Sequence, residues 1–417
     1  MKSYGIRKRL QGKETHSRRI EWRNREIMGG FATHAIFGRE VLEEMSDETL
    51  VSMIRRHLGV FGIGCQGPDL FLYNIAMLLS REEKNLGYRM HKEKSSRYFA
   101  WLMQTIWELE DIEAAEVGIS YLYGALAHYT LDSMLHPYVY ARIGFNAWEP
   151  RSGQATGGLH HWLESAIDAK MIANKLGALP SGYHAERVQK IDKAEKEILV
   201  RILSEAVSKS YHINLKKENV RAAICMMKVI TKGFFAASSR QRGLLRKIEH
   251  PFLEDYGLSN FMVTDDMVPL ARVMNRENEV WRNPWDKEIA SDDSVWDIYD
   301  KAVAQYHIYC STLEEVLIHY KRKWLKEKGT SSGMLYRKIR RSDWQGDGIQ
   351  VYKEKSSDIM KQTPDMKNVI GLFPLSRDDE NEKMQNRILH VAKELGNLSY
   401  ESGLPLSLES VLRWRSM

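Results

Sequence analysis

The segment from residue 113 to residue 136 constrains the fold more than any other feature of this sequence. It is long and largely apolar, without strand alternation, so it predicts a buried central helix. It also contains His128, Asp132 and His136, each four residues after the last. Four residues turn a helix by about 400°, so these side chains drift by only about 80° and share one face. Buried carboxylates and imidazoles are costly unless paired, so we expect partners for them inside the protein.

Helical spacing of apolar residues recurs along most of the chain. The expected helices are 33–57 (with Thr33 as N-cap), 69–86, 95–111, 113–136, 159–175, 186–208, 217–238, 295–326 and 379–395. A glycine-rich connection is expected at 59–68, a loop at 144–158 and irregular structure at 250–294. The sequence shows no sustained alternation of apolar and polar residues, which would predict strands, and no repeat of fixed period. We therefore predict an all-α, multi-helix bundle with a looser helical C-terminal part.

The positive charge of the chain lies in its first residues. Residues 1–27 hold nine of the 61 Lys and Arg residues and three of the 55 Asp and Glu residues, so residues 28–417 are neutral. Such an arm can bind nucleic acid or an anionic membrane, or stay solvated as an extension. We expect four regions: a basic extension (1–27), the main helical domain (28–325), a polar insertion or mobile region (326–378), and a C-terminal helix and tail (379–417).

Several protein classes are excluded by composition. The sequence contains no run of 18 apolar residues, so no transmembrane helix is predicted. The charged N-terminus does not resemble a secretory signal. Three scattered cysteines do not make a disulfide framework, so we expect a cytoplasmic protein. Translation could begin at Met1 or at Met28. The GxGxxG pattern at 62–67 follows no strand, which argues against dinucleotide binding.

A second helix adds to the expected site. His160 and Glu164 are again four residues apart, and His161 competes with His160 for the same role. Side chains at this spacing can converge on one metal ion, and a divalent cation would offset the burial of both groups. Three further candidates, His34, Asp69 and His91, lie on neighbouring segments. The alternative is ordinary His–carboxylate hydrogen bonding between core helices.

Taken in order, these residues resemble the bacterial zinc-dependent phospholipase C family, whose fold is shared with the S1/P1-type zinc nucleases. The phrases that carry the resemblance are THAIFGREVL, CQGPDLFLY, HYTLDSMLHPY and HHWLESAID. The resemblance covers residues 28–175 well, and residues 176–325 and 395–405 more loosely.

The resemblance implies a set of zinc ligands. Asp69, His91, His128 and Asp132 would hold one ion, His136, His160 and Glu164 a second, and His34 with a bridging Asp132 a third. It also implies zinc-activated water attacking the phosphorus of a phosphodiester, with Asp69 as general base. The implied partner is a phosphodiester substrate, with a phospholipid headgroup and transient contact with a membrane surface as expectations.

Two departures from the family pattern affect these expectations. Secreted relatives complete the third site with a processed α-amino group, whereas 33 residues precede His34 here, so we expect two zinc ions and leave the third open. The gap between Asp132 and His136 is shorter than in those relatives, and Pro137 should end or bend the helix. Two other functions stay open: an S1/P1-like nuclease acting on nucleic acid, and a non-catalytic, metal-stabilised helical protein that binds partners.

Overall fold

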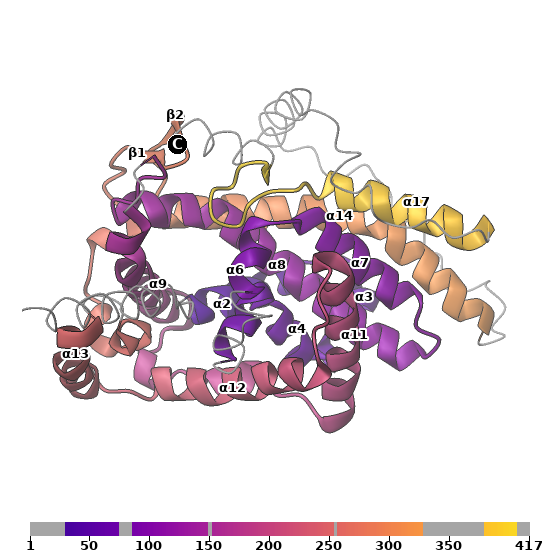
Figure 1. The fold of residues 1–417 in the computed structure, drawn as a ribbon, viewed down its shortest axis with the longest axis horizontal. Helices are drawn as coiled ribbons and strands as arrows, with labels where there is room; N and C mark the ends of the chain where they lie inside the picture. The colour runs from indigo at the N-terminus through magenta and orange to yellow at the C-terminus, as the bar shows by residue number, and fades with distance from the viewer. Residues whose placement is uncertain (1–29, 75–85, 149–151, 254–256, 328–378, 407–417) are drawn as a thin grey trace, which may run out of the picture.

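The computed structural model describes residues 30–74, 86–148, 152–253, 257–327 and 379–406. The fold is mostly helical, as predicted, with helices packed around one long central helix (Figure 1). The basic extension 1–27 lies entirely outside the described residues. The predicted polar region 326–378 lies outside them except for its first two residues. Among the residues that the structure describes, no helix is long and apolar enough to cross a bilayer.

The central helix is α8 (Ile112–Arg142), which includes the segment predicted to be buried. The side chain of Asp111 caps its first turn by accepting a hydrogen bond from Glu113 N at 2.8 Å. Nearly all side chains from Ala114 to Val139 are buried, because α2, α4, α7, α11 and α14 pack around it. Pro137 was expected to end or bend this helix, and it does not end it, because α8 continues through it to Arg142.

Two helices replace the single helix predicted over 33–57. They are α2 (Phe31–Glu43) and α3 (Glu48–Arg56), where Asp47 caps the second by accepting from Leu50 N at 3.0 Å. Thr33 is not the N-cap of α2, because that position belongs to Gly30 in a left-handed conformation. Instead, Thr33 donates both its N–H and its hydroxyl to Asp168.

The glycine-rich stretch predicted as a connection is instead a helix, α4 (Leu58–Gly64), followed by the 3-10 helix η1 (Gly67–Tyr73). Its glycines let α4 lie directly against neighbouring backbone. A Cβ on Gly64 would lie 2.5 Å from Tyr121 O, and one on Gly124 of α8 would lie 2.2 Å from Phe61 O. Close backbone packing therefore outweighs the low helix propensity of glycine here.

The remaining helices near the centre are α6 (Leu86–Lys92), α7 (Ser95–Trp107) and α9 (Ser152–Leu176). Further along the chain are η2 (Pro180–Gly182), α10 (Ala185–Val188), α11 (Lys193–Tyr211), α12 (Lys217–Phe235) and α13 (Ser239–Leu253). The helix α13 was not predicted. Only its last residues fall in the region 250–294. The regular structure in the rest of the described part of that region consists of short 3-10 turns and one hairpin.

The 3-10 turns of that region are η3 (Leu258–Phe261), η4 (Asp265–Met267) and η5 (Arg272–Met274). The hairpin pairs β1 (Trp281–Asn283) with β2 (Asp286–Ser291) in antiparallel register, with an irregularity between Arg282 and Asn283. The helices α14 (Val295–Glu327) and α17 (Asp379–Glu394) close the fold. Both contribute to the same hydrophobic core as α8, and α17 packs against α7 and α14.

Candidate metal centre

The eight predicted ligand residues lie together in the protein interior, although they come from five different elements. His34 lies on α2, Asp69 on η1, and His91 on α6. The other five lie on α8 (His128, Asp132, His136) and α9 (His160, Glu164). Every one of these side chains is buried, with at most 5% of its surface exposed. We call this set the histidine–carboxylate cluster.

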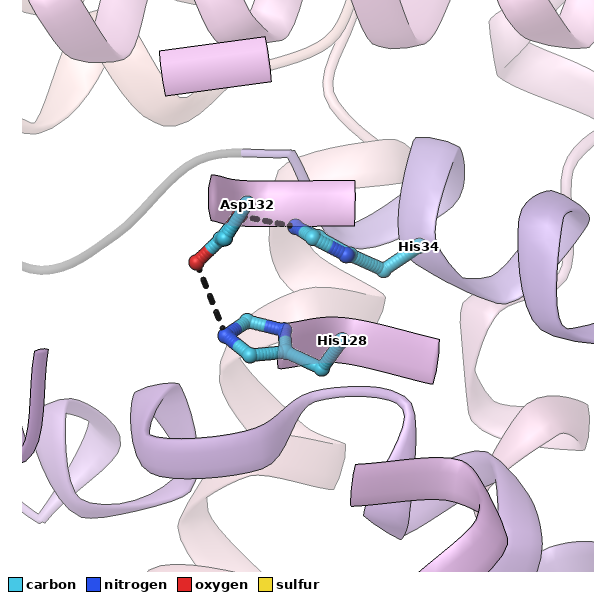
Figure 2. Close-up of side chains that lie close together, drawn as sticks. All are labelled: His34, His128 and Asp132. Carbon is cyan, nitrogen blue, oxygen red and sulfur yellow. Dashed lines mark ion pairs between the residues drawn. The ribbon is translucent and has the colours of Figure 1, made fainter. Parts of the chain in front are cut away.

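Asp132 occupies the centre of the cluster. Its Oδ1 lies 3.0 Å from His34 Nε2, and its Oδ2 lies 2.9 Å from His128 Nε2. Figure 2 shows these two imidazoles converging on the one carboxylate. Its contacts extend to His91 Nε2 at 3.4 Å and His136 Nε2 at 3.5 Å. One carboxylate therefore links four imidazoles from three helices.

Three groups within the cluster could each hold a metal ion. They are His34, His128 and Asp132; Asp69, His91 and His128; and His136, His160 and Glu164. In each group, one ligand atom per residue lies within 4.8 Å of the others. The third group matches the predicted second site. The predicted four-residue site is divided between the first two groups, which share His128.

The third group is joined by its carboxylate. Oε1 of Glu164 lies 3.0 Å from His136 Nε2 and 3.1 Å from His160 Nε2. His161, the competing residue, lies farther away, with Nδ1 3.7 Å from Glu164 Oε2, and its ring stacks on Phe261 with the centroids 4.5 Å apart. The geometry therefore favours His160 over His161, as the spacing of four residues had suggested.

Backbone carbonyls fix the orientation of three of the imidazoles. Nδ1 of His91 lies 2.8 Å from Gly87 O, and Nδ1 of His128 lies 3.2 Å from Cys65 O. Nδ1 of His136 lies 3.0 Å from Tyr400 O. A carbonyl only accepts hydrogen bonds, so each of these Nδ1 atoms must be the donor. In the neutral ring Nε2 then carries a lone pair, the state that a metal ion requires.

Several nitrogen and oxygen atoms of the cluster lie close together without forming a hydrogen bond of good geometry. Nε2 of His91 and Nε2 of His128 have no hydrogen-bond partner among the described residues, although carboxylate oxygens lie 2.9–3.4 Å away. The same holds for Asp69 Oδ1 and Asp132 Oδ2. A buried arrangement of this kind is costly unless a proton or a metal ion is shared by these atoms, and against the effect of burial the carboxylates of Asp132 and Asp69 raise the pKa of His91 well above its ordinary value. Imidazole nitrogen and carboxylate oxygen are ligands that suit zinc, so the residues fit that ion.

The pKa shifts within the cluster reflect the same crowding. Burial lowers the pKa of His136, but the carboxylates of Asp132 and Glu164 outweigh it and raise this pKa to about 9. Burial alone would raise the pKa of Asp132 and of Glu164, yet the surrounding histidines hold both well below their usual range. Without a metal ion, His136 is therefore protonated at neutral pH, and it donates to both Tyr400 O and Glu164 Oε1.

Two contributors to this site were missed by the sequence reasoning. Asp168 on α9 accepts hydrogen bonds from Ala32 N at 3.1 Å, Thr33 N at 2.8 Å and Thr33 Oγ1 at 2.6 Å. It thereby holds the start of α2 and with it His34. Its position four residues after Glu164 on the same helix could have revealed it. The carbonyl of Tyr400 could not have been found, because backbone groups leave no trace in residue type.

Comparison with known proteins gives one positive finding. Residues 33–219 match the model of a family described as "Zinc dependent phospholipase C". All eight members of the histidine–carboxylate cluster lie within these residues. No match was found among curated proteins or among solved structures.

Proposed function

We propose that the protein is a zinc-dependent phosphodiester hydrolase of phospholipase C type, because residues 33–219 match the model of the zinc-dependent phospholipase C family. The observation that carries the proposal is the set of buried imidazole nitrogens and carboxylate oxygens that converge on Asp132 without hydrogen-bond partners in the described part of the chain. Hydrogen bonding between core helices, the alternative reading, would leave fewer of these atoms without partners.

We assign the ligands as follows. Asp69, His91 and His128, with Asp132, would hold one zinc ion, and His136, His160 and Glu164 would hold a second. The second set has three protein ligands, the number typical of catalytic zinc sites. His34, with His128 and Asp132, forms a further group that could bind zinc. Zinc binding at this group would raise the number of ions from two to three.

Zinc ions, when bound, lower the pKa of water so that it is nucleophilic near neutral pH, and they neutralise charge on phosphate oxygens. The role of general base falls to Asp69, whose carboxylate would accept the proton of the attacking water. Asp69 lies on η1 with 2% of its surface exposed, and its Oδ1 is 3.1 Å from His91 Nε2. Burial excludes bulk water from this carboxylate.

We propose a phospholipid headgroup ester as the substrate, because the matching family is a phospholipase family. The test is a panel of substrates given to one zinc-quantified preparation: a phosphocholine ester, a phosphoinositide and single-stranded DNA. Hydrolysis of a lipid ester that is abolished by chelator and restored by zinc is the expected result. Preferential hydrolysis of DNA would indicate a nuclease on this scaffold, and zinc binding with no hydrolysis at all would indicate a non-catalytic protein.

A further inference from the structure

A segment far outside the family-matching residues packs on the histidine–carboxylate cluster. Residues 397–406, here called the C-terminal turn, follow α17 and run back above α6 (Figure 1). They begin 178 residues after the family match ends at residue 219. Their contacts nevertheless reach three of the proposed ligands.

The C-terminal turn is folded on itself by hydrogen bonds. Ser399 N donates to Leu404 O at 2.9 Å, and Leu406 N donates to Asn397 O at 2.9 Å. Inside this loop, Ser399 Oγ accepts from the backbone N–H groups of Glu401 and Ser402. Residues 399–402 are all buried. The turn therefore has a defined conformation from which to hold other groups.

Tyr400 connects the turn to the ligands. Its carbonyl accepts the hydrogen bond from His136 Nδ1 at 3.0 Å, and its N–H donates to the carbonyl of His91 at 3.0 Å. Its ring, 1% exposed, lies against the imidazoles of His91 and His128, with centroids 5.2 and 5.8 Å away. One residue thus touches ligands from both of the proposed zinc sites.

The C-terminal turn packs against α8 beside Pro137. Proline has no N–H, so the carbonyl of Ser133 lacks the donor that the helix would normally supply. Gly403 lies against this carbonyl with a φ of +65°, and a Cβ there would be only 2.3 Å from Ser133 O. On the other side, Asn283 Nδ2 donates to Ser402 O at 2.8 Å. The turn is therefore held in place from α8 and from the β1–β2 hairpin.

We infer that the C-terminal turn is a positioning element of the metal centre, acting through the carbonyl and ring of Tyr400. The carbonyl keeps the proton of His136 on Nδ1, so that Nε2 is free to face Glu164 and a metal ion. The ring limits the orientations open to His91 and His128. Partners of this kind change metal affinity by about 10- to 100-fold when they are disturbed. This inference rests on the proposed function for the zinc itself.

A pair of glycine substitutions tests the inference. Gly403→Ala should displace the turn, because the new Cβ meets Ser133 O and the backbone has a positive φ. Gly396→Ala is the matched control, since its φ is also positive, at +80°, but its Cβ would have no contact closer than 3.6 Å. Zinc affinity would be measured by competition with a chelator, and Co²⁺ would replace zinc to report ligand geometry by visible absorption. Thermal unfolding would show whether each variant is folded.

We expect Gly403→Ala to bind zinc about 10- to 100-fold more weakly and to change the Co²⁺ spectrum, while Gly396→Ala matches the wild type. A second measurement needs no variant: hydrogen exchange of residues 397–406 should slow when zinc is added, because coupling between two sites is reciprocal. This measurement decides the matter if Gly403→Ala does not fold. Equal affinity in both variants, or exchange unchanged by zinc, overturns the inference. Failure of the wild type to bind zinc overturns the proposed function instead.

Discussion

Asp132 is the residue on which the centre depends, because its carboxylate lies within 3.5 Å of four imidazoles. Asn would keep its size but remove its charge. We expect Asp132→Asn to lose most of the bound metal, with zinc affinity falling at least ~10-fold. Elemental analysis of the purified variant measures this. The control is Asp192→Asn, at the N-cap of α11, where Asn is also a good cap. Full zinc content in Asp132→Asn would contradict the central role of this residue.

The raised pKa of His136 leads to a prediction about pH. Its folded value is about 9 without metal, above the ordinary 6.5, so the proton stabilises the metal-free protein fully below pH 6.5. That contribution is lost as pH rises through about 9. Zinc must displace the same proton, so its stabilising effect should grow over this window.

Thermal unfolding with and without zinc, at steps from pH 6.5 to 9, measures this effect. The increase in Tm caused by zinc should become larger as pH rises, while magnesium in place of zinc serves as the control. A zinc effect that is constant or declines across the window would show that no such proton is displaced.

At the scale of elements, sequence reasoning succeeded where the information was local. The spacing of His128, Asp132 and His136 predicted one face of a helix, and α8 places all three there. It failed where distant contacts decide the structure. The glycines of α4 indicated a connection because their propensity is low, yet contact with α8 makes them helical. That His34, Asp69 and His91 meet α8 could be expected only from the family resemblance, because no spacing within the chain joins them.

The link between α9 and α2 can be tested by removing its hydrogen bonds. Thr33→Val keeps the shape of the side chain but removes the hydroxyl that donates to Asp168. Asp168→Asn replaces the carboxylate that accepts three hydrogen bonds with a neutral amide. We expect the unfolding free energy to fall by about 1 kcal/mol in the first variant and by about 1–3 kcal/mol in the second. Urea denaturation measures both.

Thr312→Val is the matched control, because that hydroxyl donates only to Ile308 O within its own helix. Its unfolding free energy should stay within about 0.5 kcal/mol of the wild type. If Thr33→Val is as stable as this control, Asp168 does not hold α2 in the way described.

At the scale of the whole molecule, the charge and the proposed chemistry are carried by different parts of the chain. Residues 1–27 account for the entire net charge of +6, and the histidine–carboxylate cluster lies in residues 34–164. We expect deletion of residues 1–27 to leave zinc content and phosphodiester hydrolysis unchanged. Binding to anionic vesicles should weaken, because the deletion removes the Lys and Arg side chains that anionic lipids attract. Cosedimentation with vesicles and a chromogenic phosphodiester assay, run on the same two proteins, measure these properties. Loss of hydrolysis on deletion would show that the arm takes part in the site.

The most direct test of the central claim is to locate the metal itself. Crystals grown with zinc should give anomalous scattering peaks among the side chains of the histidine–carboxylate cluster, with one at His136, His160 and Glu164 and one beside Asp132. Peaks in those positions are the result that this account predicts. A map with no zinc in the cluster, and with its imidazoles and carboxylates hydrogen-bonded to one another, would contradict it.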